Sequence, residues 1–157
     1  MLLSINKIET KLQVWRKASK VIVFTNGCFD LLHKGHESLL QTANTLGDIL
    51  IVGLNSDASV KILKGDKRPI EKQEIRAQKL SKLKSVNVVC IFEDPTPSEL
   101  IKLIRPNVIV KGGDYKRNEI VGSQAVNEWG GKVTIVPLVK GYSTSSIIKK
   151  NKIEDLV

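Results

Sequence analysis

The chain has 157 residues, a length typical of one domain, and 41% of them are hydrophobic while 26% are charged. This composition excludes a disordered tail, a coiled coil and a collagen-like chain. The chain carries 25 lysines and arginines against 16 acidic residues, a net charge of +9. Such a balance favours phosphate-bearing partners, namely nucleotides, nucleic acid or anionic lipid, although a generally basic proteome would also produce it.

The N-terminal segment predicts an amphipathic helix rather than a targeting signal. Ile5, Ile8, Leu12 and Trp15 recur at helical spacing, and the segment lacks the apolar centre of a signal peptide. No stretch of the chain approaches the ~18 apolar residues that a membrane span requires. The two cysteines form no CxxC pair, which favours a reducing compartment. We therefore expect a cytoplasmic protein that does not contact a membrane.

Short apolar runs rich in β-branched residues predict buried strands over 21–26, 48–55, 86–92, 107–113 and 132–138. Amphipathic stretches between and after them predict helices over 34–46, 71–84, 96–104, 123–130 and 143–156. Strands buried on both faces that alternate with helices indicate an α/β fold, in which helices cover both sides of a parallel sheet. We expect one domain over 1–157, with an N-terminal helical segment at 1–19 and a catalytic core at 20–150.

The loops after the strands are where a ligand site is expected. Ligands of such sheets bind beyond the carboxyl ends of the strands, at the point where the strand order reverses. The loops that meet this condition here are 26–36, 55–69, 111–122 and 139–145.

Both histidines of the chain lie in one of these loops. His33 and His36 belong to the run GCFDLLHKGH, residues 27–36, which directly follows the first predicted strand. A three-residue spacing places them on one side of a starting helix, whose N-terminal amides and dipole favour a phosphate. Two imidazoles there add donors for developing phosphoryl charge, and Gly35 between them allows a close approach to the backbone. A two-histidine metal site is the competing interpretation, but no motif supplies a third ligand.

The same run resembles the GxFDxxHxGH signature of nucleotidyltransferases related to the cytidylyltransferases. The run GYSTSSI at 141–147 is similar to their second signature, a Ser/Thr-rich turn that opens the last helix, although simple helix capping would also explain it. The resemblance implies a Rossmann-like, doubly wound sheet of five parallel strands in three layers. It also implies an enzyme that joins a nucleotide to a phosphorylated small molecule.

Within this family the chain is most similar to the heptose 1-phosphate adenylyltransferases. The stretches that carry the similarity are NSDASVKILKGDKRPI at 55–70 with Arg76 after it, VKGGDY at 110–115, and STSSII. The similarity covers about residues 21 to 150. Because this activity often occurs beside a sugar kinase, and no kinase half accompanies the sequence, a stand-alone form is expected.

The resemblance also implies residue roles. Catalysis is expected of His33, His36 and Lys64. Nucleotide binding is expected of Thr25, Asn26, Gly27, Cys28, Phe29, His33, Gly35, His36, Lys111, Gly112, Ser143, Thr144 and Ser145. Binding of the phosphorylated substrate is expected of Asp30, Asn55, Arg68, Arg76 and Asp114. For Asp30 and Asp114, bracing of the histidine loop or metal binding remain alternatives, and for Asp30 so does helix capping. Lys64 and Arg68 offer mobile and forked positive charge, or simply form a solvated basic loop.

The expected reaction transfers AMP from ATP to a heptose 1-phosphate and releases pyrophosphate. Magnesium is expected on the substrate phosphates, so no residue is assigned to it. The resemblance further implies a homodimer. The first alternative is a cytidylyltransferase acting on glycerol 3-phosphate or a similar phosphorylated alcohol. Those enzymes usually carry an arginine before the glycine of the second signature, where this chain has Lys140.

A nucleic-acid-binding module is the alternative from another class, because the chain is strongly basic. Aromatic residues make up only 4% of the chain, however, and no RNA-binding signature occurs. Trp15 and Trp129 are expected to pack at the core rather than stack on bases. The chain is also too short to combine an aminoacyl-tRNA synthetase core with anticodon recognition. No nucleic-acid partner is therefore expected.

Overall fold

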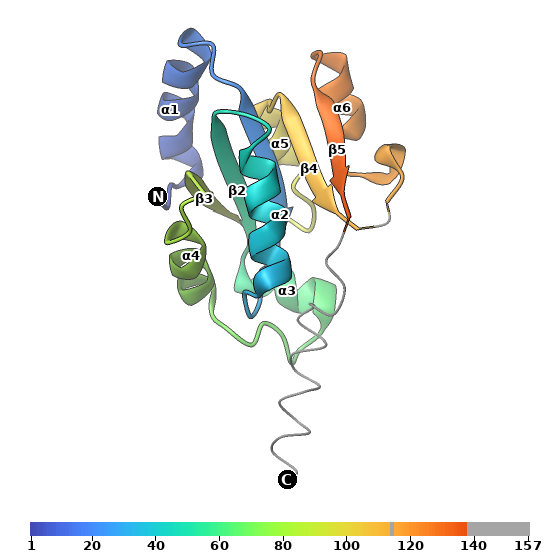
Figure 1. Cartoon of the computed structure of the whole chain (residues 1–157). Coiled ribbons are helices and arrows are strands. Elements are labelled where there is room, and N and C mark those ends of the chain that lie inside the picture. The colour runs from blue at the N-terminus through green and yellow to red at the C-terminus, as the bar shows by residue number, and fades with distance from the viewer. Residues whose placement is uncertain (114, 138–157) are drawn as a thin grey trace.

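The computed structural model describes residues 1–113 and 115–137, and a parallel five-stranded sheet lies at its centre (Figure 1). The strands are β1 Ile22–Gly27, β2 Ile49–Asn55, β3 Val88–Phe92, β4 Val108–Gly112 and β5 Lys132–Val136. They are ordered β3-β2-β1-β4-β5. The five predicted strands are confirmed, each within two residues of its expected bounds. The strand order reverses beside β1, because β2 follows it along the chain on one side and β4 lies on the other.

Helices cover both faces of the sheet and complete three layers. They are α1 Ile5–Lys17, α2 Lys34–Asn44, α3 Asp57–Lys64, α4 Gln73–Ser81, α5 Ser98–Ile104 and α6 Ser123–Glu128, with a short 3-10 helix η1 at Arg117–Glu119. The predicted helices up to residue 130 are confirmed in place, with shorter ends. The helix predicted over 143–156 lies outside the described residues.

Alternation along β1 divides the core into two parts. Phe24 packs in the cluster that holds Leu12 of α1 and residues of α5 and α6, whereas Val23 faces the cluster that holds Leu40 of α2 and Leu80 of α4. Successive side chains of a strand point to opposite faces, so a strand buried on both sides must be apolar throughout. This explains why the strands appear in the sequence as continuous apolar runs.

The N-terminal segment belongs to the same core. Ser4 caps α1, since its Oγ accepts a hydrogen bond from the Lys7 N–H, and Ile8 and Leu12 are fully buried. Trp15 packs at the margin of this core and Trp129, the C-cap of α6, does the same, so the expected packing role of both is confirmed.

Helix α3 corrects the expectation that 55–69 is a loop. Ser56 caps the helix through its Oγ, which accepts from the Ser59 N–H at 3.1 Å, and Val60 is fully buried beneath it. Ile62 and Leu63 are 73% and 53% exposed, although both are apolar. The apolar pattern therefore does not mark the buried side of this helix, which is why periodicity alone missed it.

Candidate active site

The crevice at the carboxyl end of the sheet arises where β1 and β4 part. Pairing of β1 with β2 continues to Gly27 and Leu54, but pairing of β1 with β4 ends at Phe24 and Ile109. Beyond that point the Thr25 hydroxyl donates to the Val110 carbonyl at 2.9 Å. The strands thus separate at the switch in strand order, the expected location of a ligand site in such sheets.

A cavity of about 410 Å³ fills this crevice, a volume within the usual range for small-molecule sites. Its walls come from the ends of β1, β2 and β4 and from the segments that follow them. The lining residues are Thr25, Asn26, Gly27, Cys28, Phe29, Asp30, His36, Leu39, Asn55, Leu63, Lys64, Arg68, Pro95, Pro97, Lys111, Gly112 and Tyr115.

The start of α2 is closed by the two histidines themselves. His33 is the N-cap, and its Nδ1 accepts from the N–H groups of Gly35 at 3.1 Å and His36 at 3.3 Å. The Nδ1 of His36 accepts in return from the His33 N–H at 3.3 Å. Two of the amides expected to bind phosphate thus already have an imidazole acceptor in this structure, and phosphate binding at this helix start stays a prediction.

This reciprocal cap has a chemical consequence for both rings. An imidazole whose Nδ1 accepts a hydrogen bond carries its proton on Nε2 when it is neutral. His33 and His36 stack with their ring centroids 3.6 Å apart, and the edge of Phe29 lies against His36 at 5.3 Å. The hydrogen bonds from backbone N–H groups thus fix the tautomer of both imidazoles, and the ring packing fixes the orientation of their planes. His36 lines the cavity, where its ring can act as an N–H donor.

Both imidazoles are held in the neutral form near pH 7. Burial lowers the pKa of His36 to about 4, with further contributions from His33 and Lys64. Burial also lowers the pKa of His33. A neutral imidazole costs less to bury than an imidazolium. A phosphate that enters the cavity would favour the charged form of the ring, because opposite charges attract.

The lowered pKa of His36 predicts that stability falls as the solution is acidified from pH 7.5 to pH 5. In this window the unfolded chain, whose histidines titrate near about 6.5, binds a proton that the folded His36 does not bind until about pH 4. The unfolded state then binds more protons, so the free energy of unfolding decreases as the pH falls. Urea midpoints at both pH values measure the effect. A His36→Asn variant should lose less stability than the wild type, and equal losses in both proteins would contradict the assignment.

The charged groups of the cavity are mostly positive. Lys64 comes from the end of α3, Arg68 from the segment after it, and Lys111 from β4. Burial lowers the pKa of Lys111, with Cys28 raising it and Lys64 lowering it further, and its ammonium lies 5.6 Å from the ring centroid of Tyr115. Asp30 is the one acidic residue among the described lining residues. A cavity of this kind favours a multiply charged anion.

Arg76 does not face this cavity, which corrects the expectation that it binds substrate. Its side chain is fully buried, and Nη1 donates to the carbonyl of Cys28 at 2.7 Å and to that of Asn55 at 2.8 Å. Its Nε donates to the Glu71 carbonyl at 2.9 Å and Nη2 to the Asp57 carboxylate at 2.8 Å. The guanidinium therefore joins the ends of β1 and β2 from beneath the site.

Asp30 also lies within the structure rather than at its surface. Its Oδ2 accepts from Arg68 Nε at 2.9 Å and from the Ile70 N–H at 2.8 Å, and its Oδ1 accepts from the Glu71 N–H at 2.9 Å. Burial alone would raise the pKa of this carboxyl, but these hydrogen bonds hold it below its ordinary value. Of the roles considered for Asp30, the observed contacts match bracing of the histidine loop.

Most of the expected site residues among those that the structure describes thus surround one cavity. His33 and Gly35 form the helix cap beside the cavity, and Asn55 reaches it while its Nδ2 donates to Ser59 at 2.7 Å. The residues that sequence reasoning missed are Leu39, Leu63, Pro95, Pro97 and Tyr115. The two prolines follow β3, whose carboxyl end marks the same edge of the sheet, and that position was the available signal. Asp114, Ser143, Thr144 and Ser145 lie outside the described residues.

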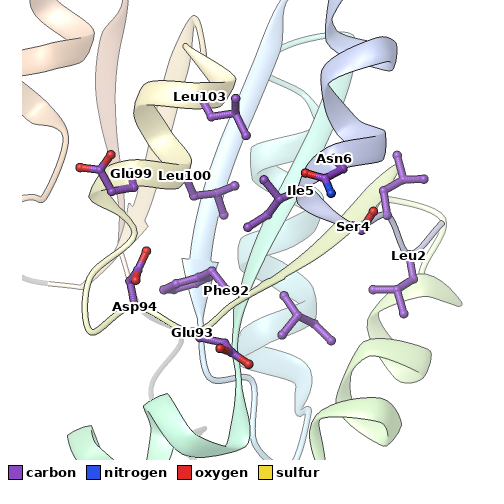
Figure 2. Close-up of a pocket in the computed structure, with 12 residues that line it drawn as sticks. Leu2, Ser4, Ile5, Asn6, Phe92, Glu93, Asp94, Glu99, Leu100 and Leu103 are labelled. Carbon is purple, nitrogen blue, oxygen red and sulfur yellow. The ribbon is translucent and has the colours of Figure 1, made fainter.

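A second cavity, of about 780 Å³, lies between α1, the end of β3 and α5 (Figure 2). Ile5, Phe92 and Leu100 contribute apolar walls, and the carboxylates at its edge belong to Glu93, Asp94 and Glu99. None of the described residues that line it carries a positive charge. Despite its larger volume, this cavity does not offer the chemistry of a phosphate site.

Residues 1–113 and 115–137 contain neither a metal-binding cluster nor a membrane-spanning helix. No group of three or more His, Cys, Asp or Glu side chains in these ranges is arranged to hold a metal ion. Within the same ranges, every helix is too short or too polar to cross a bilayer.

Comparison with known sequences agrees with this geometry. Residues 24–154 match the family described as cytidylyltransferase-like. The bifunctional protein HldE of Wolinella succinogenes is 52% identical over 149 residues, which make up 95% of this chain and 31% of that protein. The protein of the same name from Helicobacter pylori is 52% identical over 145 residues, or 92% of this chain and 30% of that protein. The chain therefore spans about a third of the length of these curated relatives.

Solved structures show the same architecture. The lipopolysaccharide core biosynthesis protein of Thermoplasma volcanium superposes with a TM-score of 0.64 at 27% identity, covering 79% of this chain and 99% of that one. Pantoate-beta-alanine ligase of Francisella tularensis, at 17% identity, shares the fold with a TM-score of 0.65 over 99% of this chain and 78% of that one. Because the family model matches residues 24–154, most of its length, the chain belongs to the cytidylyltransferase-like family.

Proposed function

We propose that this chain is an adenylyltransferase that transfers AMP from ATP to a heptose 1-phosphate. A phosphate oxygen of the sugar attacks the α-phosphorus of ATP in line, and a new P–O bond forms. The bond from the α-phosphorus to the oxygen that bridges to the β-phosphate breaks. ADP-heptose and pyrophosphate are the products. No covalent enzyme intermediate is needed, because the sugar phosphate is already an anionic nucleophile.

The observation that carries this proposal is the convergence of His36, Lys64, Arg68 and Lys111 on one cavity at the switch in strand order. Two anions must meet there despite their mutual repulsion, and the cations offset that repulsion while holding both reactants in position. A neutral imidazole with a fixed N–H adds a donor that is already oriented for charge that develops during transfer.

The choice of ATP and of a heptose rests on similarity. The segments KGDKRP and VKGGDY are similar to the heptose enzymes, and relatives at about half identity bear the name bifunctional protein HldE. A structural neighbour at 27% identity is named as a lipopolysaccharide core biosynthesis protein. Lys140 in place of an arginine also weighs against the glycerol 3-phosphate cytidylyltransferases.

In this proposal His33, His36 and Lys64 act on the phosphates of ATP during the transfer. The turn at Thr25–Phe29, together with Lys111 and Gly112, forms the nucleotide side of the cavity, and Ser143, Thr144 and Ser145 serve the outer phosphates. Arg68, Asn55 and Asp114 belong to the acceptor side. Magnesium enters as part of the ATP complex, held mainly by phosphate oxygens.

The proposed setting is the cytoplasm, where ATP is available, and the resemblance adds a homodimer as the working form. The reaction needs neither nucleic acid nor a membrane. Size-exclusion chromatography with light scattering would test the dimer.

A substrate panel tests the proposal directly. ATP or CTP is combined with heptose 1-phosphate, other sugar 1-phosphates or glycerol 3-phosphate, and pyrophosphate release is followed. We expect release with ATP and heptose 1-phosphate and a clear preference for ATP over CTP, because a mismatched base leaves buried polar groups unpaired. Release with CTP and glycerol 3-phosphate, but not with ATP and heptose 1-phosphate, would overturn the substrate assignment while leaving nucleotidyl transfer in place.

A further inference from the structure

The loop that carries the histidines is tied to a segment about forty residues later through one buried carboxylate. Asp30 is 1% exposed, and three hydrogen bonds reach it from Arg68, Ile70 and Glu71. Glu71 returns the connection, because its Oε1 accepts from the Leu31 N–H at 3.2 Å. The histidine loop and the segment 68–71 are therefore held as one unit.

The backbone beside this carboxylate is strained. Phe29 and Leu31, on either side of Asp30, adopt positive φ values of 46° and 57°. Such conformations are unfavourable for residues other than glycine and persist where surrounding contacts over-determine them. Asp30 and Glu71 supply such contacts, so the hydrogen bonds between the two segments maintain the shape of the histidine loop.

Asp30 and Arg68 both line the cavity, but the Asp30 side chain is buried, so Arg68 is the more accessible charge of this unit. Its Nε bonds to Asp30, its side chain is 15% exposed, and its guanidinium belongs to the cavity wall. A guanidinium anchored through Nε keeps its terminal nitrogens in a fixed plane, whereas an unanchored arginine samples many rotamers. Asp30 thereby sets the direction in which Arg68 presents its donors.

We propose that Asp30 is a positioning residue that acts through Arg68. Its carboxylate holds the guanidinium in register with His36, so that the donors of the histidine loop and of the segment 68–71 meet the same pair of phosphorylated reactants. The proposal rests on the proposed nucleotidyl transfer. It separates Asp30 from the residues that contact substrate.

A double-mutant cycle tests this role. Asp30→Asn and Arg68→Gln are made singly and together, and kcat and KM are measured for each substrate well below the thermal transition of each variant. Each single change should lower kcat/KM on the order of 10²-fold, as a misplaced reactant does. Because Asp30 acts through Arg68, the double variant should be no worse than Arg68→Gln by more than about 3-fold. Losses that multiply would overturn the proposal, and so would a loss of stability with unchanged kinetics.

A further variant distinguishes geometry from charge. Arg68→Lys keeps the positive charge but cannot bond to Asp30 and offer a planar fork at the same time. We expect its kcat/KM to stay close to that of Arg68→Gln, and recovery to the wild-type value would contradict the positioning role. This test does not depend on whether Asp30→Asn folds.

The matched control is Glu99→Gln, which removes a carboxylate from an exposed ion pair with Lys102 outside the cavity. It should leave kcat/KM unchanged. If the wild-type protein releases no pyrophosphate with any substrate pair, the proposed function fails. The cycle is then measured on the Kd for inorganic pyrophosphate, where the same non-additivity supports the positioning role and additive losses overturn it.

Discussion

Replacement of His36 by alanine is expected to lower kcat by about 10²–10³-fold while the fold survives. The reason lies in the cap of α2, where the two histidines fix each other through their Nδ1 atoms and stack at 3.6 Å. The substitution removes the Nε2–H donor that faces the cavity and also loosens His33. A preorganised donor of this kind acts mainly on the transition state, so kcat should fall more than KM rises.

Steady-state kinetics with thermal unfolding on the same samples measures this effect. Lys34→Ala provides the matched control, because Lys34 is the exposed first residue of the same helix and does not line the cavity. It should retain its turnover. A His36→Ala protein with near-normal kcat and an unchanged melting temperature would remove His36 from the proposed chemistry.

Replacement of Arg76 by methionine should lower the free energy of unfolding by about 3–5 kcal/mol. The buried guanidinium satisfies the carbonyls of Cys28, Asn55 and Glu71. Methionine fills part of the space but donates no hydrogen bond, so the three carbonyls lose the partner that Arg76 supplies. Since two of these carbonyls end β1 and β2, the cavity should deform together with the loss of stability.

Urea unfolding followed by circular dichroism gives the change in free energy. Arg117→Met is the control, because Arg117 is an exposed residue of η1 that is distant in sequence from these carbonyls. Its effect should stay within about 0.5 kcal/mol. If Arg76→Met proves as stable as this control, the guanidinium does not support the strand ends.

The sequence alone determined the architecture and the place of the site. Buried parallel strands must be apolar on both faces, so the five runs such as 21–26 and 48–55 stand out without any tertiary information. Chain order then puts the histidine run after the first strand, and the general behaviour of such sheets puts a ligand at that edge. The resemblance to the GxFDxxHxGH signature added the expected reaction class, nucleotidyl transfer. Each of these inferences depends on local features that can be read along the sequence.

Only the tertiary structure decided what the polar residues do at that edge. A local pattern cannot show that His33 caps its own helix, that Arg76 is buried beneath two strand ends, or that Asp30 holds Arg68 across 38 residues of sequence. The sequence does not show whether a charged side chain faces a phosphate or a buried carbonyl. Its role depends on burial and on partners from distant segments, because the cost of removing a charge from water must be met by specific contacts that exist only once the chain has folded.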